Sequence, residues 1–232
     1  MTLATCDSYL QGIRLRATRL DECGAPVEGA CSTVVTKGFI NIALDVNETN
    51  PTEISQVLAD GSRCYFVETQ KLLNNVQATI EFCQVDPTLF EMMTGSPLMF
   101  DDATDPVAIG FTTDSASYGV ANVALEVWLN LDPNGCGTTG RRWGYYLIPW
   151  LYNGTVGKPT IENGAVNFTV NEAISHEGNQ WGTGPYDIQL DKNGNLSPLF
   201  SPLASSVHDL LYKVNLPPPD PSCGCTALVL PS

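Results

Sequence analysis

Two histidines, His176 and His208, are the residues on which a Ser–His–Asp or Cys–His mechanism would depend. His176 lies in a segment rich in Gly and Asn, SHEGNQWG, and His208 precedes Asp209 in a strand-like run. Neither is accompanied by the G-x-S-x-G sequence of a nucleophile elbow. We therefore expect two structural histidines, at the surface or half-buried, and no catalytic residue.

Carboxylates are the next candidates for chemistry. Asp101, Asp102 and Asp105 share one turn-rich segment, and Glu162 and Glu172 flank a strand-like run. Paired carboxylates can hydrolyse glycosides, and clustered oxygens can bind Ca²⁺. With 25 Asp and Glu in the chain, however, such neighbours arise by chance, and the spaced ligands of a Ca²⁺ loop are missing. The expectation is solvated loops, with no cofactor and no metal site.

Eight cysteines raise the question of disulfides or a structural metal. Without a secretory signal, reduced thiols are the expectation. Cys64 and Cys83 lie in apolar strand-like runs and are expected to be small core residues. The remaining candidates would form a metal clip or a disulfide tie if the two ends of the domain meet, and their spacing leaves free, disulfide-bonded and metal-bound states open: Cys6, Cys23, Cys31, Cys223 and Cys225.

The charge balance is strongly acidic, with 11 Lys and Arg against 25 Asp and Glu and a net charge of −14. Nucleic-acid binders draw affinity from basic side chains that neutralise phosphates, so this balance argues against that class. The glycine-rich phosphate loops of nucleotide-binding proteins are missing from the sequence. An acidic balance is typical both of ordinary soluble proteins and of a surface that must not retain nucleic acid.

Nothing in the sequence predicts a membrane partner. The first ten residues lack the basic start and apolar centre of a secretory signal. The most apolar strand-like run, 120–131, is interrupted by Asn122, Glu126 and Asn130. We therefore expect a protein that is synthesised in the cytoplasm.

An aromatic run, WGYYLIPWLY at 143–152, has three interpretations. It would suit a sugar-stacking platform or a surface for single-stranded nucleic acid, but such surfaces include a basic groove, and only Arg141 and Arg142 precede the run. We favour the third, a strand that crosses a β-sandwich and contributes to a subunit contact, where aromatic residues and Arg are enriched.

Strand patterns dominate the rest of the chain. Apolar and polar residues alternate with period two at 13–18, 40–46, 122–131, 166–170, 186–190 and 208–216. Asn163-Gly164 and the run DKNG at 191–194 are hairpin-turn sequences. Helix evidence is confined to 86–95, where Asp86 is placed to cap a helix, Pro87 suits its first position and Gly95 its end.

These elements predict a mainly β protein, an antiparallel β-sandwich or barrel with one flanking α-helix. No break in composition divides residues 1–216, so we expect a single β domain there. The polar segment 47–61 is expected to be a loop between strands. Residues 217–232 contain five prolines and are expected to form an extended arm, because proline cannot join a central strand.

Four segments together carry a resemblance to a known family: EFCQVDPTLFEMMTG at 81–95, and the segments 19–42, 141–170 and 181–199. In this order the chain resembles the major tail protein, or tail tube protein, of long, non-contractile-tailed phages that infect actinobacteria. Members form a β-sandwich or barrel with a flanking helix. They close into six-membered rings by joining sheets edge to edge, and the rings stack into a hollow tube.

The resemblance implies a virion structural protein, not an enzyme, that conducts DNA into the host. It implies homo-hexameric rings and, as partners, the tape measure, tail terminator and distal tail proteins, with genomic DNA passing through the lumen without specific binding. The segment 47–61 would be the hairpin that reaches a neighbouring subunit. A virion decoration protein or a carbohydrate-binding β-sandwich is the alternative.

A conduit for DNA needs a wall that repels phosphate, and screening limits that repulsion to about 8 Å at physiological salt. The sequence offers two strand faces for such a wall, one that bears Glu81 and one that bears Asn122 and Glu126. It does not decide between them. Three arginines on one strand are expected to meet acidic groups of the next subunit: Arg14, Arg16 and Arg19.

Overall fold

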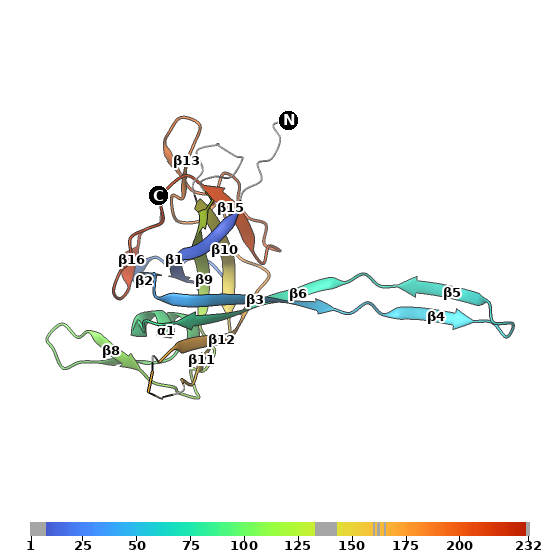
Figure 1. The fold of residues 1–232 in the computed structure, drawn as a ribbon, viewed down its shortest axis with the longest axis horizontal. Helices are drawn as coiled ribbons and strands as arrows, with labels where there is room; N and C mark the ends of the chain where they lie inside the picture. Colours follow the sequence, from blue (N-terminus) through green and yellow to red (C-terminus); the bar gives the residue numbers. More distant parts are fainter. Residues whose placement is uncertain (1–7, 133–142, 160, 162, 165, 231–232) are drawn as a thin grey trace.

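A single antiparallel sheet of ten strands organises the chain, in a computed structural model that describes residues 8–132, 143–159, 161, 163–164 and 166–230 (Figure 1). Its strands are β1 (Tyr9–Arg19), β2 (Gly29–Thr36), β3 (Phe39–Thr49), β6 (Leu72–Phe82), β9 (Asn122–Leu131), β10 (Trp143–Tyr152), β11 (Thr155–Gly157), β12 (Phe168–Ser175), β15 (Leu210–Val214) and β16 (Thr226–Leu228). The protein is thus mainly β, as the strand patterns predict.

The sheet forks at β10. The strand order is β16-β2-β1-β9-β10-β12-β6-β3, while β15 pairs with the first half of β10 and β11 pairs with β12. Residues 143–147 of β10 pair with β15, whereas only Leu151 and Tyr152 of β10 pair with β12. A register shift separates Ile148 from Leu151, at Pro149, which has no backbone N–H to give to the ladder. The change of partner lets the β12-β6-β3 part leave the plane of the other strands.

The part of the sheet that contains β1, β9 and β10 is covered on both faces, so the core has two parts. The first cluster joins the apolar sides of β1, β9, β6 and β12 around the only helix among the described residues, α1 (Pro87–Thr94). The second lies on the opposite face, where Trp128, Tyr145 and Trp150 pack against the segment after β12, with Trp181 and Leu199. The aromatic run at 143–152 is therefore a core strand, in which Tyr145 and Trp150 are buried. Trp143, Tyr146 and Tyr152 are half-buried, and the expected subunit contact stays a prediction.

The helix forms where the sequence predicts it. Asp86 accepts hydrogen bonds from the backbone N–H groups of Thr88 and Leu89, and Pro87 occupies the first turn. Gly95 ends the helix with φ of 75°, a left-handed conformation that suits glycine. Between these ends Phe90 is fully buried and stacks on Phe111, with ring centroids 5.0 Å apart.

The segment 47–61 is not a polar loop, because it belongs to a long β-hairpin. Beyond the body, β3 and β6 continue through β4 (Glu53–Val57) and β5 (Arg63–Glu68), and the hairpin projects far from the sheet (Figure 1). We call residues 46–73 the arm. Cys64 lies on it and is exposed, as is Cys83 at the end of β6, so neither is the core residue that the sequence predicts.

Two smaller hairpins complete the strands. β7 (Leu98–Phe100) pairs with β8 (Ala108–Phe111) in a projection on the side of the body away from the arm (Figure 1). Asp101, Asp102 and Asp105 lie in its turn. β13 (Gln189–Leu190) pairs with β14 (Leu196–Ser197) around the predicted turn at 191–194. The turn at Asn163-Gly164 lies between residues that are outside the described ones.

The C-terminal segment returns to the sheet. Although residues 217–232 are predicted to be an extended arm, β16 pairs with the outer edge of β2, and Cys225 forms a disulfide with Cys31. The expectation of reduced thiols is therefore wrong for this pair. Cys23 and Cys223 are free, and Cys6 lies outside the described residues.

The aromatic packing of α1 gives a test of the first core cluster. Replacing the buried Phe90 by Ala removes its contacts with Phe82, Phe111 and Phe168, and should lower the free energy of unfolding by about 3–5 kcal/mol. Phe100→Ala is the matched control, because Phe100 is 54% exposed and its loss should cost less than about 0.5 kcal/mol. Urea unfolding curves measure both, and equal costs would contradict this description of the core.

Candidate functional site

One face of the sheet region β3, β6, β11 and β12 is polar and reaches solvent. Along β6, Val76, Ala78 and Ile80 point into the first core cluster, while alternate residues, among them Gln77 and Glu81, stay partly exposed. The cross-strand pairs of β3 and β12 place their own polar side chains on the same side. We call this surface the open face.

The strands of the open face carry charges of one sign. The strands β3, β6, β11 and β12 contain four carboxylates and neither Lys nor Arg. The carboxylates are Asp45, Glu48, Glu81 and Glu172. Of these, Glu48 pairs with Lys71 at the root of the arm, with Oε2 2.7 Å from Nζ, and Glu81 accepts a hydrogen bond from the Asn167 amide. A phosphate that approaches this face therefore meets acceptors and negative charge.

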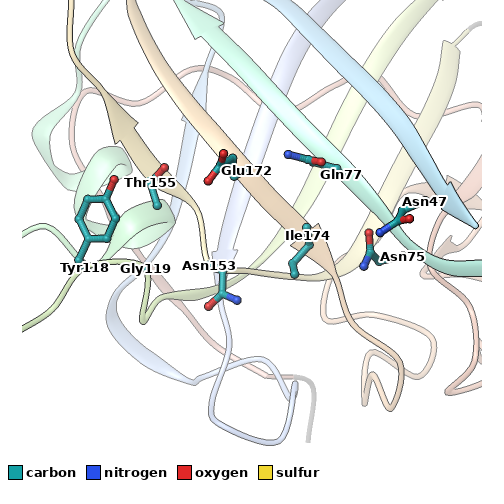
Figure 2. Close-up of a pocket in the computed structure, with 9 residues that line it drawn as sticks. All are labelled: Asn47, Asn75, Gln77, Tyr118, Gly119, Asn153, Thr155, Glu172 and Ile174. Carbon is teal, nitrogen blue, oxygen red and sulfur yellow. The ribbon is translucent and has the colours of Figure 1, made fainter.

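A hollow of about 450 Å³ lies where the open face meets the root of the arm (Figure 2). It is lined by Asn47, Asn75, Gln77, Tyr118, Gly119, Asn153, Thr155, Glu172 and Ile174. Figure 2 shows Asn47 and Asn75 close together and the Gln77 amide directed toward Glu172. Amides that both donate and accept give this part of the face hydrogen-bonding capacity without positive charge.

The backbone is unusual at two residues of the hollow. Glu172 has φ of 60° and Asn153 has φ of 59°, and both values are uncommon for residues other than glycine. Glu172 lies at a β-bulge, because the β12–β6 register shifts between Val170 and Ala173. A bulge places one extra residue on one strand and turns its side chain outward. The bulge therefore explains why Glu172 is exposed on the open face.

The alternative wall, with Asn122 and Glu126, is closed to solvent. Glu126 is 0% exposed, and both of its oxygens accept hydrogen bonds. The side chain of Asn122 accepts a hydrogen bond from Trp150 Nε1 at 2.9 Å. Of the two strand faces that the sequence offers, only the one with Glu81 has carboxylates that a passing polymer would meet.

Glu126 belongs to a buried charge cluster. Arg16 donates from Nε and Nη2 to its two oxygens at 2.5 and 2.6 Å, and the Tyr145 hydroxyl donates to Oε1 at 2.6 Å. The Arg16 guanidinium also lies 3.3 Å from the ring centroid of Tyr186. Burial and, after it, the Glu126 carboxylate raise the pKa of Tyr145 well above its usual value. Burial alone would lower the pKa of Arg16, but Glu126 outweighs that effect and the pKa is raised.

Two of the three arginines on β1 therefore have their partners inside the chain. Arg16 binds Glu126, and Arg19 binds Glu91 of α1 with Nη2 2.6 Å from Oε2. The prediction that they meet acidic groups of the next subunit is wrong for these two. Arg14 is half-buried, and its Nε and Nη1 have no hydrogen-bond partner among the described residues.

His208 forms a hydrogen bond with Ser175 that the sequence does not predict. Its Nδ1 lies 2.7 Å from Ser175 Oγ, and its Nε2 is 3.6 Å from a Glu177 oxygen. Ser175 is only 3% exposed, and its Oγ also accepts the backbone N–H of Val76. The group therefore joins β12 to the root of the arm. His208 is buried rather than half-buried, and 33 residues separate it from Ser175, so no local pattern indicates the pair.

The other candidates for chemistry remain apart. Asp101 accepts hydrogen bonds from the backbone of its own turn, at Ala103 and Val107. Glu162 lies outside the described residues. Among those that are described, no three His, Cys, Asp or Glu side chains could share a metal ion. His176 is exposed and stacks on Trp150, with ring centroids 4.3 Å apart.

The arm carries exposed apolar side chains that no other described residue covers. Ile54 is opposite Val67 and Gln56 is opposite Tyr65, so three apolar residues share one face of its outer part. Ile54 and Tyr65 are 55% and 54% exposed. The other face pairs Glu53 with Glu68 and Ser55 with Phe66, and is more polar. A two-stranded hairpin is marginal by itself in water, so this one needs a surface against which to pack.

The chain matches no protein-family model, and no curated protein sequence matches it. In the part of the chain that the structure describes, no helix is long and apolar enough to cross a membrane.

The contribution of the buried Arg16–Glu126 ion pair to stability can be tested by substitution. Glu126→Gln leaves the Arg16 guanidinium buried without its counter-charge, and should lower the free energy of unfolding by about 3–5 kcal/mol. The matched control is Glu91→Gln, whose pair with Arg19 is 24% and 32% exposed and should be worth about 1 kcal/mol or less. Urea unfolding curves measure both, and similar losses would mean that the Arg16–Glu126 pair is not a critical contact.

Proposed function

We propose that the chain is a virion structural protein, the subunit of hexameric rings that stack into the tail tube of a long-tailed, non-contractile phage. The observation that carries the proposal is the open face, a solvent-facing sheet surface with four carboxylates and no cationic residue on its strands. Facing a lumen, such a surface repels the phosphates of passing DNA. The proposed partners at the tube ends and inside are the tail terminator, distal tail and tape measure proteins.

The repulsion between the wall carboxylates and the DNA phosphates acts only over a short range. At physiological salt the repulsion from a carboxylate extends about 8 Å, so it acts near the wall and not across a wide bore. The amides of the hollow add neutral hydrogen-bonding groups to the same surface. The strands of this wall have no Lys or Arg that could displace the counterions of DNA, and that displacement is the main source of nonspecific affinity for DNA. DNA would therefore slide along it without being retained.

The arm supports the ring assignment. Its length and its uncovered apolar face, with Ile54, Tyr65 and Val67, suit insertion against a neighbouring subunit. Burying apolar surface contributes about 25 cal/mol per Å², so a few such side chains supply several kcal/mol per contact. A contact in which an arm meets a different surface of the next copy is head-to-tail, and such contacts generate rings when the rotation closes and helical filaments when it does not.

One observation favours a second candidate, a carbohydrate-binding module. The hollow gathers four amide side chains, one carboxylate and the exposed ring of Tyr118, which are groups that bind and stack on sugars. Such a module would remain a monomer or small oligomer and would gain thermal stability from a sugar. Negative-stain microscopy of the concentrated protein separates the two candidates, since rings or tubes are expected only from the first.

The arm should be needed for assembly and not for folding. Ile54→Asp places a charge on the apolar face of an element that is exposed in the single chain, so the melting temperature of the subunit should stay the same. Rings should fail to form, because burying an unpaired charge is costly. Val229→Asp is the matched control, since Val229 is exposed elsewhere. Sedimentation velocity and microscopy measure assembly, and normal rings from Ile54→Asp would refute the role of the arm.

The open face should repel DNA within an assembled tube. Replacing Asp45 and Glu81 by Lys should leave tubes assembled but make them retain DNA, increasingly as salt falls, because cationic walls release counterions. Asp102→Lys with Asp105→Lys is the control, since it changes net charge equally at the β7–β8 turn. DNA retained per tube at 50 and 200 mM salt is the measurement. Equal retention by both variants would overturn the placement of the open face while leaving the tube proposal intact.

A further inference from the structure

The C-terminal residues 222–228, which we call the strap, lie along the outer edge of β2. Ser222 donates its backbone N–H to the Val35 carbonyl at 2.9 Å and accepts the Val35 N–H at its hydroxyl. Farther along, Thr226 pairs with Thr33 and Leu228 with Gly29. Without the strap, the backbone groups of β2 on this side would be an unpaired strand edge.

The strap is also attached to the helix and to the core. Gly224 donates its N–H to Oδ2 of Asp86, whose other oxygen caps α1. Leu228 is buried, and the half-buried Cys225 packs on the first core cluster. The covalent attachment is the disulfide between Cys225 and Cys31, two residues that are 194 positions apart in the chain. Opening that one bond leaves hydrogen bonds and a single buried side chain to hold the strap.

A free thiol lies beside this disulfide in the sequence. Cys223 is exposed and unpaired, and only Gly224 separates it from Cys225. Gly224 has φ of 78°, so the chain turns sharply between the two cysteines. Cys31, at the other end of the disulfide, has φ of 59°, an unfavourable conformation for a residue other than glycine that its release would relieve.

We propose that the strap is a thiol-switched clasp, in which Cys223 opens the Cys31–Cys225 disulfide by internal exchange and uncovers the edge of β2. The Cys223 thiolate attacks Sγ of Cys225, a Cys223–Cys225 bond forms, and the Cys31–Cys225 bond breaks. Cys31 leaves as a thiolate and takes up the proton that Cys223 released. One disulfide is lost and one is gained, so the step needs no external oxidant or reductant. The inference does not depend on the proposed function.

Disulfide mapping of the full-length protein tests the exchange. After incubation at pH 8.5, quenching with acid and alkylation, peptide mass spectrometry should find both the Cys31–Cys225 and the Cys223–Cys225 disulfides. Alkylated Cys31 should increase as alkylated Cys223 decreases. Cys223→Ser should retain Cys31–Cys225 alone. Cys23→Ser, which removes another exposed free thiol, should behave as the unchanged protein. Cys31 that stays unalkylated in the unchanged protein would overturn the proposal.

Hydrogen exchange tests whether the disulfide holds the strap. In Cys31→Ser the amide of Val35 and those of 222–228 should exchange at least about tenfold faster than in the unchanged protein, because opening then needs no bond cleavage. The amide of Phe90 in α1 should keep its protection and so report an intact body. If the variant does not fold, the unchanged protein reduced with a dithiol gives the same comparison. Equal protection at Val35 with and without the disulfide would overturn the clasp.

Discussion

The pairing of Arg16 with Glu126 is the interaction on which the arrangement of the two sheet faces depends. The two residues are opposite each other on β1 and β9, and neither charge is tolerable in the interior without the other. A slip of one residue between these strands would put the two side chains on opposite faces of the sheet and leave each charge without the other. The ion pair therefore fixes which side of β1 and β9 belongs to the second core cluster, the one with Trp128 and Tyr145.

That constraint determines which surface is left for function. Because the face with Glu126 is closed by the segment after β12, the solvent-facing carboxylates on the strands of this sheet are confined to the β3-β6-β12 part beyond the fork at β10. The same part carries the arm, and the Ser175–His208 hydrogen bond joins it to the segment before β15. The same two strands, β3 and β6, therefore contribute to the open face and extend into the arm.

Local patterns in the sequence were sufficient for some elements and not for others. The helix at 86–95 was predicted with both ends, since Asp86, Pro87 and Gly95 act on neighbouring backbone. The strands were predicted because period two needs only one buried face. Residue patterns did not predict the arm, because 47–61 was expected to be a polar loop and Cys64 a core residue, and alternation does not reveal whether anything covers a strand. The resemblance, in contrast, implied a hairpin at 47–61, and a hairpin is present there. The partners of Arg16, Ser175 and Cys31 lie 110, 33 and 194 residues away, and only the fold brings them together.

The direction of the arm has a mechanical consequence. In an antiparallel pair the hydrogen bonds run perpendicular to the strands. A pull on the tip along the arm is shared by β3 and β6, because the turn joins them, and it loads the ladder between β6 and β12 in shear. The ten residue pairs between β3 and β6, from Phe39–Phe82 to Thr49–Leu72, are then not pulled past one another. A force that separates the two strands sideways would open the pairs one after another. The hairpin is therefore strong as a tether along its own length and weak against peeling.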